Sequence, residues 1–64
     1  MSIGERLRNL RGSKSVTEVA EALGIAQSTL SMYENDERIP RDIIKIKIAK
    51  YYNQTIESIF FADE

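Results

Sequence analysis

Two pairs of acidic side chains, Glu18 with Glu21 and Asp36 with Glu37, have a spacing that acid–base catalysis could use. The sequence has no cysteine and no histidine, which removes thiolate and imidazole metal ligands and every Ser-His or Cys-His nucleophile. Neither acidic pair adjoins a plausible nucleophile. We therefore expect no catalysis, no bound metal and no cofactor.

Uncharged polar residues between positions 27 and 34 offer a different chemistry, that of hydrogen bonding at a surface. Leu30 and Tyr33 are three residues apart and are predicted to point inward together from a helix. The residues predicted to face outward carry no charge: Gln27, Ser28, Thr29, Ser31 and Met32. With only 64 residues in the chain, this pattern favours a binding module over an enzyme.

Two helices are predicted before this segment. Ser15 and Glu18 have the spacing of a capping box, in which each side chain accepts from the other's backbone N–H, so a helix should begin at Val16. Gly24 can take the left-handed conformation that ends a helix. An earlier helix is predicted between a Ser2 cap and Gly12, with a buried stripe of Ile3, Leu7 and Leu10.

Two further helices are predicted after it. Pro40 favours an extended Ile39, and a long helix should begin near Asp42. Its buried row is predicted to be Ile44, Ile48 and Tyr52, widened by Ile43, Ile46, Ala49 and Tyr51. Thr55 should cap a short helix that ends at Phe61. We expect an all-α, compact five-helix fold, one domain over residues 1–64, with a helix-turn-helix at about 16–34.

The formal net charge of -1 and the pI near 5.4 argue mildly against a nucleic-acid partner, but the charges are segregated. Basic residues gather in 1–14 and 38–50, and acidic residues in 15–37 and at the end. A local basic surface is therefore possible. No apolar run reaches the roughly 18 residues of a membrane span. We expect a cytoplasmic protein with no membrane partner, and Met1 with the acidic Asp63 and Glu64 favours a whole chain over a fragment.

The spacing from Ser15 to Glu34 is that of a helix-turn-helix, in which Ala20 allows close helix crossing and Leu30 fills it. At these positions the chain resembles the phage Cro and repressor family of bacterial regulators, also called the Xre family. The likeness continues through the following positions: Tyr33, Glu34, Asn35, Pro40, Ile48, Ala49 and Ile59.

This resemblance implies a lambda-repressor-like fold that binds duplex DNA as a transcriptional regulator, with the helix from Gln27 to Tyr33 in the major groove. The residues that would read bases are Gln27, Ser28, Ser31 and Met32. Those that would contact the backbone or minor groove are Thr17, Thr29, Asn35, Arg38, Arg41 and Lys45. A homodimer is expected through Ile59, Phe60 and Phe61, with no small-molecule ligand.

Some positions depart from the family pattern. Val16 stands where many relatives have a phosphate-contacting glutamine, and Ala26 stands where Ser or Thr caps the helix. Asp36 replaces a common glycine, and we expect its carboxylate to project away from the DNA. Arg11 and Glu34 match positions that pair across the domain in relatives, a structural role.

A second class of function stays open, namely a helical protein-interaction module, either antitoxin-like or a partner of another repressor, that keeps the fold. The low pI, Val16 and the apolar end of the chain favour it. The two hypotheses differ in whether Gln27, Arg41 and Lys45 share one surface, since DNA binding requires them together.

Overall fold

Residues 1–62 are described by a computed structural model, and within them the chain forms five α-helices and no strand. The helices are α1 (Ile3–Arg11), α2 (Val16–Leu23), α3 (Gln27–Glu34), α4 (Asp42–Tyr52) and α5 (Ile56–Phe60). This confirms the expected all-α class; the last helix ends one residue earlier than predicted, at Phe60. The terminal Asp63 and Glu64 lie outside the described residues.

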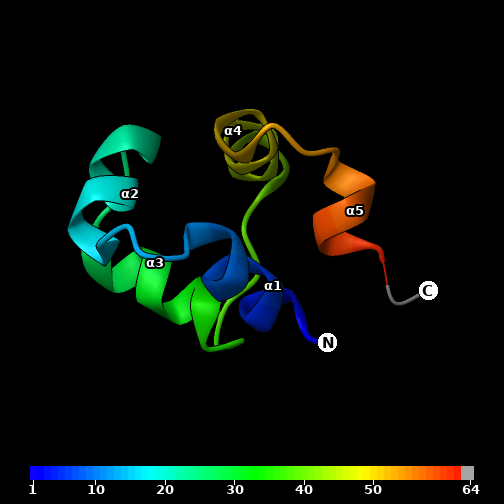
Figure 1. Cartoon of the computed structure of the whole chain (residues 1–64), viewed down its shortest axis with the longest axis horizontal. Helices are drawn as coiled ribbons and strands as arrows, with labels where there is room; N and C mark the ends of the chain where they lie inside the picture. The colour runs from blue at the N-terminus through cyan, green and yellow to red at the C-terminus, as the bar shows by residue number, and fades with distance from the viewer. Residues whose placement is uncertain (63–64) are drawn as a thin grey trace.

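The helices pack in a ring of contacts. α3 lies against both α1 and α2, α4 lies against α2 and α5, and α5 returns to α1. Figure 1 shows α2 and α3 together at one end of the molecule and α5 at the other, with α4 seen along its axis between them. α3 therefore has a supported inner side and a free outer side.

Side-chain caps begin three of the helices as predicted. Ser15 Oγ accepts from the Glu18 N–H at 3.0 Å, which is one of the two bonds expected there. The complete capping box forms instead at α1, where Glu5 N–H donates to Ser2 Oγ (3.1 Å) and Ser2 N–H to Glu5 Oε1 (2.8 Å). Hydrogen bonding from that backbone N–H lowers the pKa of Glu5. Thr55 caps α5.

Gly24 ends α2 in the left-handed conformation, with φ 71° and ψ 33°. The N–H of Ile25 donates to the Ala20 carbonyl (3.0 Å) and the N–H of Gly24 to the Glu21 carbonyl (3.2 Å), the two bonds of a Schellman motif. Ile25 then packs, half-buried, against the core. This turn sets the direction in which α3 leaves α2.

Side chains from all five helices make the core: Leu7, Val19, Ala20, Leu23, Leu30, Tyr33, Ile48, Ala49, Ile59 and Phe60. The prediction was wrong for Ile43 and Ile46 of α4, which are 65% and 42% exposed. At about 100° per residue, Ile46 lies about 160° around the helix from Ile48, whose side chain is fully buried. The helix is apolar on nearly every side, but α2 and α5 cover only part of it.

The expected dimer interface at the terminal apolar residues also needs a correction. Ile59 and Phe60, expected at a dimer interface, are 1% and 6% exposed and belong to the core of the chain itself. Burial between α5 and the rest of the fold leaves them no surface for a partner. Phe61, at 45% exposed, is the terminal aromatic that remains accessible.

Candidate nucleic-acid interface

The outer side of α3 is the candidate contact surface. Gln27 and Ser28 are exposed, Ser31 and Met32 are half-buried, and together they span about 140° of the helix circumference. Leu30 and Tyr33 are buried on the inner side, as the spacing predicted. The surface carries no charge of its own, so it can select a ligand by hydrogen bonds and shape.

Ala26 is the N-cap of α3 and makes no side-chain cap bond. The departure from a Ser or Thr cap seen in the sequence is therefore present in the structure. Loss of such a cap costs about 1 kcal/mol of helix stability. It also leaves the first-turn N–H groups without a side-chain acceptor, at the end of the helix where an anion is favoured.

A buried ion pair joins α1 to the end of α3. Arg11 Nε donates to Glu34 Oε2 at 2.8 Å and Arg11 Nη2 to Glu34 Oε1 at 3.1 Å, a two-pronged contact. The Glu34 side chain is 5% exposed and that of Arg11 is 21% exposed. The hydrogen bond to Glu34 raises the pKa of Arg11. The pairing expected from the resemblance is thus formed.

Asp36 makes a second connection between the same two helices. Its backbone is left-handed, with φ 60°, at the position where relatives commonly have glycine. Its carboxylate accepts from Ser2 Oγ (2.7 Å) and from the Gly4 N–H (2.9 Å), and these bonds lower the pKa of Asp36. The acidic group is therefore held against the beginning of α1, and hydrogen bonds there offset the backbone strain.

Close backbone approach accompanies these contacts. Gly4 of α1 lies so near the end of α3 that a Cβ at this position would stand 2.3 Å from the Glu34 carbonyl oxygen. Only a glycine fits here without displacement of one helix. α1 thus supports α3 through an ion pair, a carboxylate bond and direct backbone contact.

Comparison with known proteins agrees with this arrangement of α2, turn and α3. A family model for the helix-turn-helix matches residues 5–59.

The chain belongs to the helix-turn-helix family.

A curated relative, the HTH-type transcriptional regulator ImmR of Bacillus subtilis (strain 168), is 36% identical to it over 66 residues, an alignment that covers 100% of this chain and 52% of ImmR. The chain thus spans about half the length of the curated relative that it matches. These findings confirm the Xre-type resemblance.

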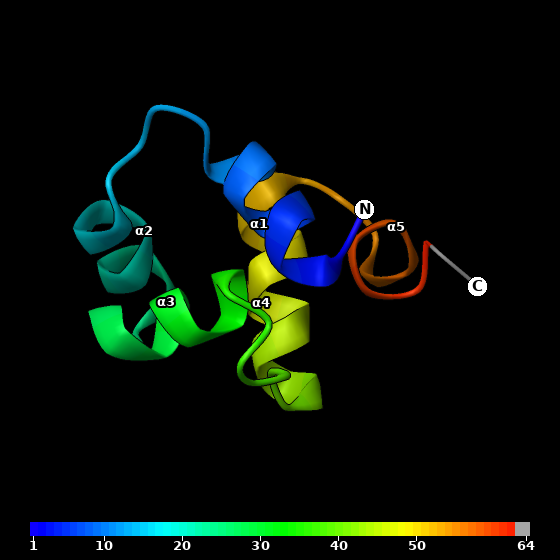
Figure 2. The same ribbon diagram turned by 90° about the horizontal axis from the view of Figure 1, so that it is seen from below.

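In this helix-turn-helix protein the residues expected to contact the DNA backbone lie on three parts of the chain. Thr17 is exposed on the first turn of α2, and Thr29 is half-buried on α3. Asn35, Arg38 and Arg41 are exposed in the segment that leads from α3 to α4. Figure 2 shows this segment, together with α3 and the first turn of α4, along the lower side of the molecule.

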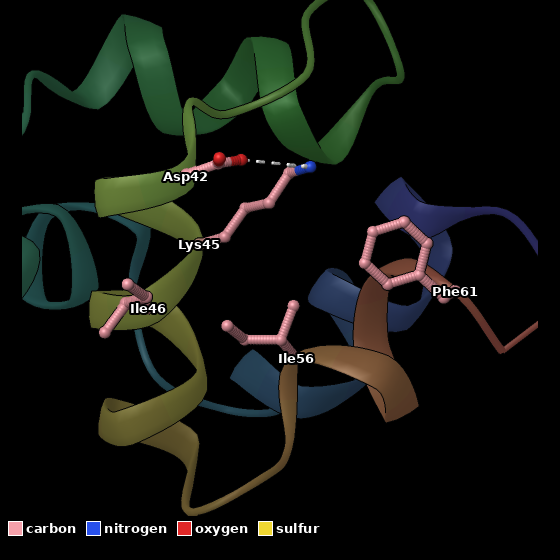
Figure 3. A pocket seen from close by; sticks show the side chains of 5 residues that line it. All are labelled: Asp42, Lys45, Ile46, Ile56 and Phe61. Atoms are coloured by element: carbon pink, nitrogen blue, oxygen red, sulfur yellow. Dashed lines mark ion pairs between the residues drawn. The ribbon is translucent and has the colours of Figure 1, made fainter.

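Lys45 does not join them, contrary to the expectation. Its ammonium lies 5.5 Å and 5.3 Å from the ring centroids of Phe60 and Phe61, and 3.9 Å from Asp42 Oδ1. The side chain is 16% exposed. Attraction to the two rings and the carboxylate holds the charge between Asp42 and Phe61 (Figure 3), and little of the side chain is left exposed for another contact.

Sequence reasoning missed two contributors to the helix-turn-helix surface, Arg8 and the Ser2–Asp36 contact. Arg8 Nη1 donates to the Glu34 carbonyl and to Asn35 Oδ1. Each contact joins residues more than 25 positions apart, and neither has a local pattern that would reveal it. A signal did exist for Asp36, because an acidic residue at a position that favours glycine needs a partner to hold it there.

Within residues 1–62, no helix is long and apolar enough to cross a bilayer.

Proposed function

We propose that this chain is a sequence-specific, duplex-DNA-binding transcriptional regulator that acts as a repressor in the cytoplasm. The observation that carries this is the free, uncharged outer side of α3, presented by a helix-turn-helix and followed by exposed Arg38 and Arg41. A surface of this kind combines groups that can read base edges with cations that neutralise phosphates. The relative's name, a transcriptional regulator, accords with it.

In this proposal α3 lies in the major groove of the duplex. Gln27, exposed at the start of the helix, would accept from adenine N6 and donate to N7, while Met32 would meet a thymine methyl. Ser28 and Ser31 would bond to base edges between them. The contacts that set register without reading sequence would come from Thr17, Thr29, Asn35, Arg38 and Arg41.

Gln27→Ala and Arg41→Ala are expected to weaken DNA binding in different ways. Loss of the Gln27 amide should cost about 1 to 3 kcal/mol on the preferred duplex and little on a scrambled one, because it removes a base-specific contact. Loss of the Arg41 charge should weaken binding to both duplexes and lower the slope of log affinity against log salt by about one. Site selection from random duplexes, then titrations at three salt concentrations, would measure both.

The matched control is Gln54→Ala, the same substitution in the exposed connection between α4 and α5. It should leave both affinities unchanged. Equal losses on the preferred and scrambled duplexes for Gln27→Ala would remove that residue from base reading. A wild-type chain with no measurable affinity for any duplex would contradict the proposed function itself.

We also propose that the regulator binds as a homodimer, with two α3 helices about 34 Å apart on successive major-groove turns. The support is an apolar groove of about 340 Å³ between α4 and α5, lined by Ile46, Ile56 and Phe61 beside Asp42 and Lys45. Figure 3 shows Ile46 on α4, with Ile56 on α5 and Phe61 just beyond the end of α5 on the other side of Lys45. Exposed apolar surface of this kind is typically covered in the functional state.

Phe61→Ser is therefore expected to weaken self-association without unfolding the chain, since Phe61 is 45% exposed. Sedimentation at a series of concentrations, free and on the selected duplex, would show the shift toward monomer. Ile43→Ser, which changes another exposed apolar residue, at 65%, that does not line the groove, is the control. A wild-type chain that sediments as a monomer both free and on DNA would overturn the dimer.

A protein-interaction module is the second candidate, favoured by the low exposure of the Lys45 side chain, which leaves one expected DNA contact fewer, and by the same apolar groove. The duplex titrations decide between the two functions. Binding with a steep salt dependence supports the regulator, and its absence supports the module.

A further inference from the structure

Arg8 and Asn35 meet where the last turn of α1 reaches the end of α3. Arg8 Nη1 donates to the backbone carbonyl of Glu34 and, at 3.3 Å, to Asn35 Oδ1. Both side chains are exposed. The contact therefore lies at the edge of the proposed DNA surface and outside the core.

The chemistry of the two groups determines which way the amide points. A guanidinium has only donors, so the atom of Asn35 that faces Arg8 must be the amide oxygen. The amide NH₂ group is then directed to the other side. The backbone N–H of Asn35 is occupied, because it donates to the Ser31 carbonyl at 3.0 Å. The side-chain NH₂ is thus the donor that Asn35 has left to offer.

The charge at this end of α3 also supports a contact between Asn35 and a phosphate. The C-terminus of a helix carries partial negative charge, which repels phosphate, and α3 has no basic residue in its own last turn. Arg8 supplies a positive charge there from a different helix. It therefore offsets the repulsion at the place where Asn35 would approach the DNA backbone.

We infer that Arg8 is a positioning residue for DNA binding: it holds the Asn35 amide with its NH₂ group toward a phosphate, an anion that only accepts hydrogen bonds. The inference rests on the proposed function and adds to it a residue of α1 that touches no base. Without Arg8, the amide can rotate and present its oxygen to the phosphate, which is repulsive.

A double-mutant cycle tests this, with Arg8→Met, Asn35→Ala and the combined variant titrated against the selected duplex. Each single change should weaken binding about 2- to 10-fold, the range expected for one hydrogen bond. The combined variant should bind somewhat more weakly than Asn35→Ala alone, because the Arg8 charge is lost, but its total loss should be clearly less than the product of the two single losses, since Arg8 then has no amide to orient. Arg8→Lys, which keeps a cation and its donors, should restore more of the affinity in the Asn35 background than in the Asn35→Ala background.

Two controls separate this role from others. Lys50→Met removes an exposed charge from the last turn of α4 and should leave the affinity nearly unchanged. Thermal melts of each variant identify any loss of fold. Multiplicative losses in the cycle would show that Arg8 acts independently of Asn35 and would overturn the inference. The proposed function survives that result, provided that wild-type binding and the Gln27→Ala loss of specificity are observed.

Discussion

Glu34→Ala is expected to lower the free energy of unfolding by about 3 kcal/mol, because it leaves the Arg11 guanidinium partly buried without its carboxylate. The pair is geometrically well made, with N–O distances of 2.8 Å and 3.1 Å, and the Glu34 side chain is 5% exposed. Arg11→Ala should cost as much or more, about 3 to 4 kcal/mol, because it leaves the Glu34 carboxylate, whose side chain is only 5% exposed, without its guanidinium.

The double variant should lose less than the sum of the two single losses, because removal of both charges leaves neither stranded. Urea melts of the four proteins at neutral pH measure the coupling. Glu34→Gln is the conservative variant and should lie between wild type and Glu34→Ala, because an amide keeps the shape and one acceptor. Glu37→Ala, a change at an exposed carboxylate, should lie within about 0.5 kcal/mol of wild type. Strictly additive losses would show that the pair is not coupled.

Tyr52 lies in the electrostatic environment of this pair. Burial, with the negative charge of Glu34, raises the pKa of Tyr52 to about 12. The phenol is therefore neutral across the range in which the melts are made. The coupling measured there belongs to Arg11 and Glu34 and contains no contribution from titration of the neighbouring ring.

Gly4→Ala is expected to destabilise the fold by about 3 kcal/mol, at the upper end of the range for overpacking. In an exposed helix the same change would stabilise by about 1 kcal/mol, because alanine has the higher helix propensity. Here the added Cβ would stand 2.3 Å from the Glu34 carbonyl oxygen and 2.7 Å from its carbon, which are backbone atoms that cannot rotate away. Steric overlap therefore outweighs propensity.

Urea melts again provide the measurement, with Gly24→Ala as the control. Gly24 is in the left-handed conformation, with φ 71° and ψ 33°, and a Cβ there would meet nothing within 4 Å. That variant should lose about 1 kcal/mol, from backbone strain alone. A Gly4→Ala variant as stable as wild type would mean that α1 and α3 separate more easily than their contacts imply.

Local signals account for what the sequence could predict. The Ser15 cap, the Gly24 turn and the inward spacing of Leu30 and Tyr33 each depend on a few neighbouring residues, and each is found as expected. The helix-turn-helix and the exposed start of α3 follow from them. The bounds of α2 and α4 were predictable for the same reason.

Features that depend on distant residues were beyond such patterns. Ile46 and Phe60 are both apolar residues in helical segments, but Ile46 is 42% and Phe60 6% exposed, because α5 packs Phe60 into the core while Ile46 lies on a side of α4 that stays partly uncovered. The sequence gives Lys45 no visible partner nearby, because the two aromatic rings beside its ammonium come from Phe60 at the end of α5 and Phe61 just after it. The partner of Asp36 is Ser2, 34 positions earlier in the chain, so no local pattern revealed it.

The Asp36 contact has a practical consequence for redesign of the surface that we propose to read DNA. The second half of the helix-turn-helix cannot be exchanged as an independent cassette, because its last residues are matched to Ser2, Gly4, Arg8 and Arg11 on the first helix. A graft that imports a foreign sequence through position 36 would have to carry the corresponding part of α1 with it. Libraries confined to positions 27, 28, 31 and 32 leave that match intact.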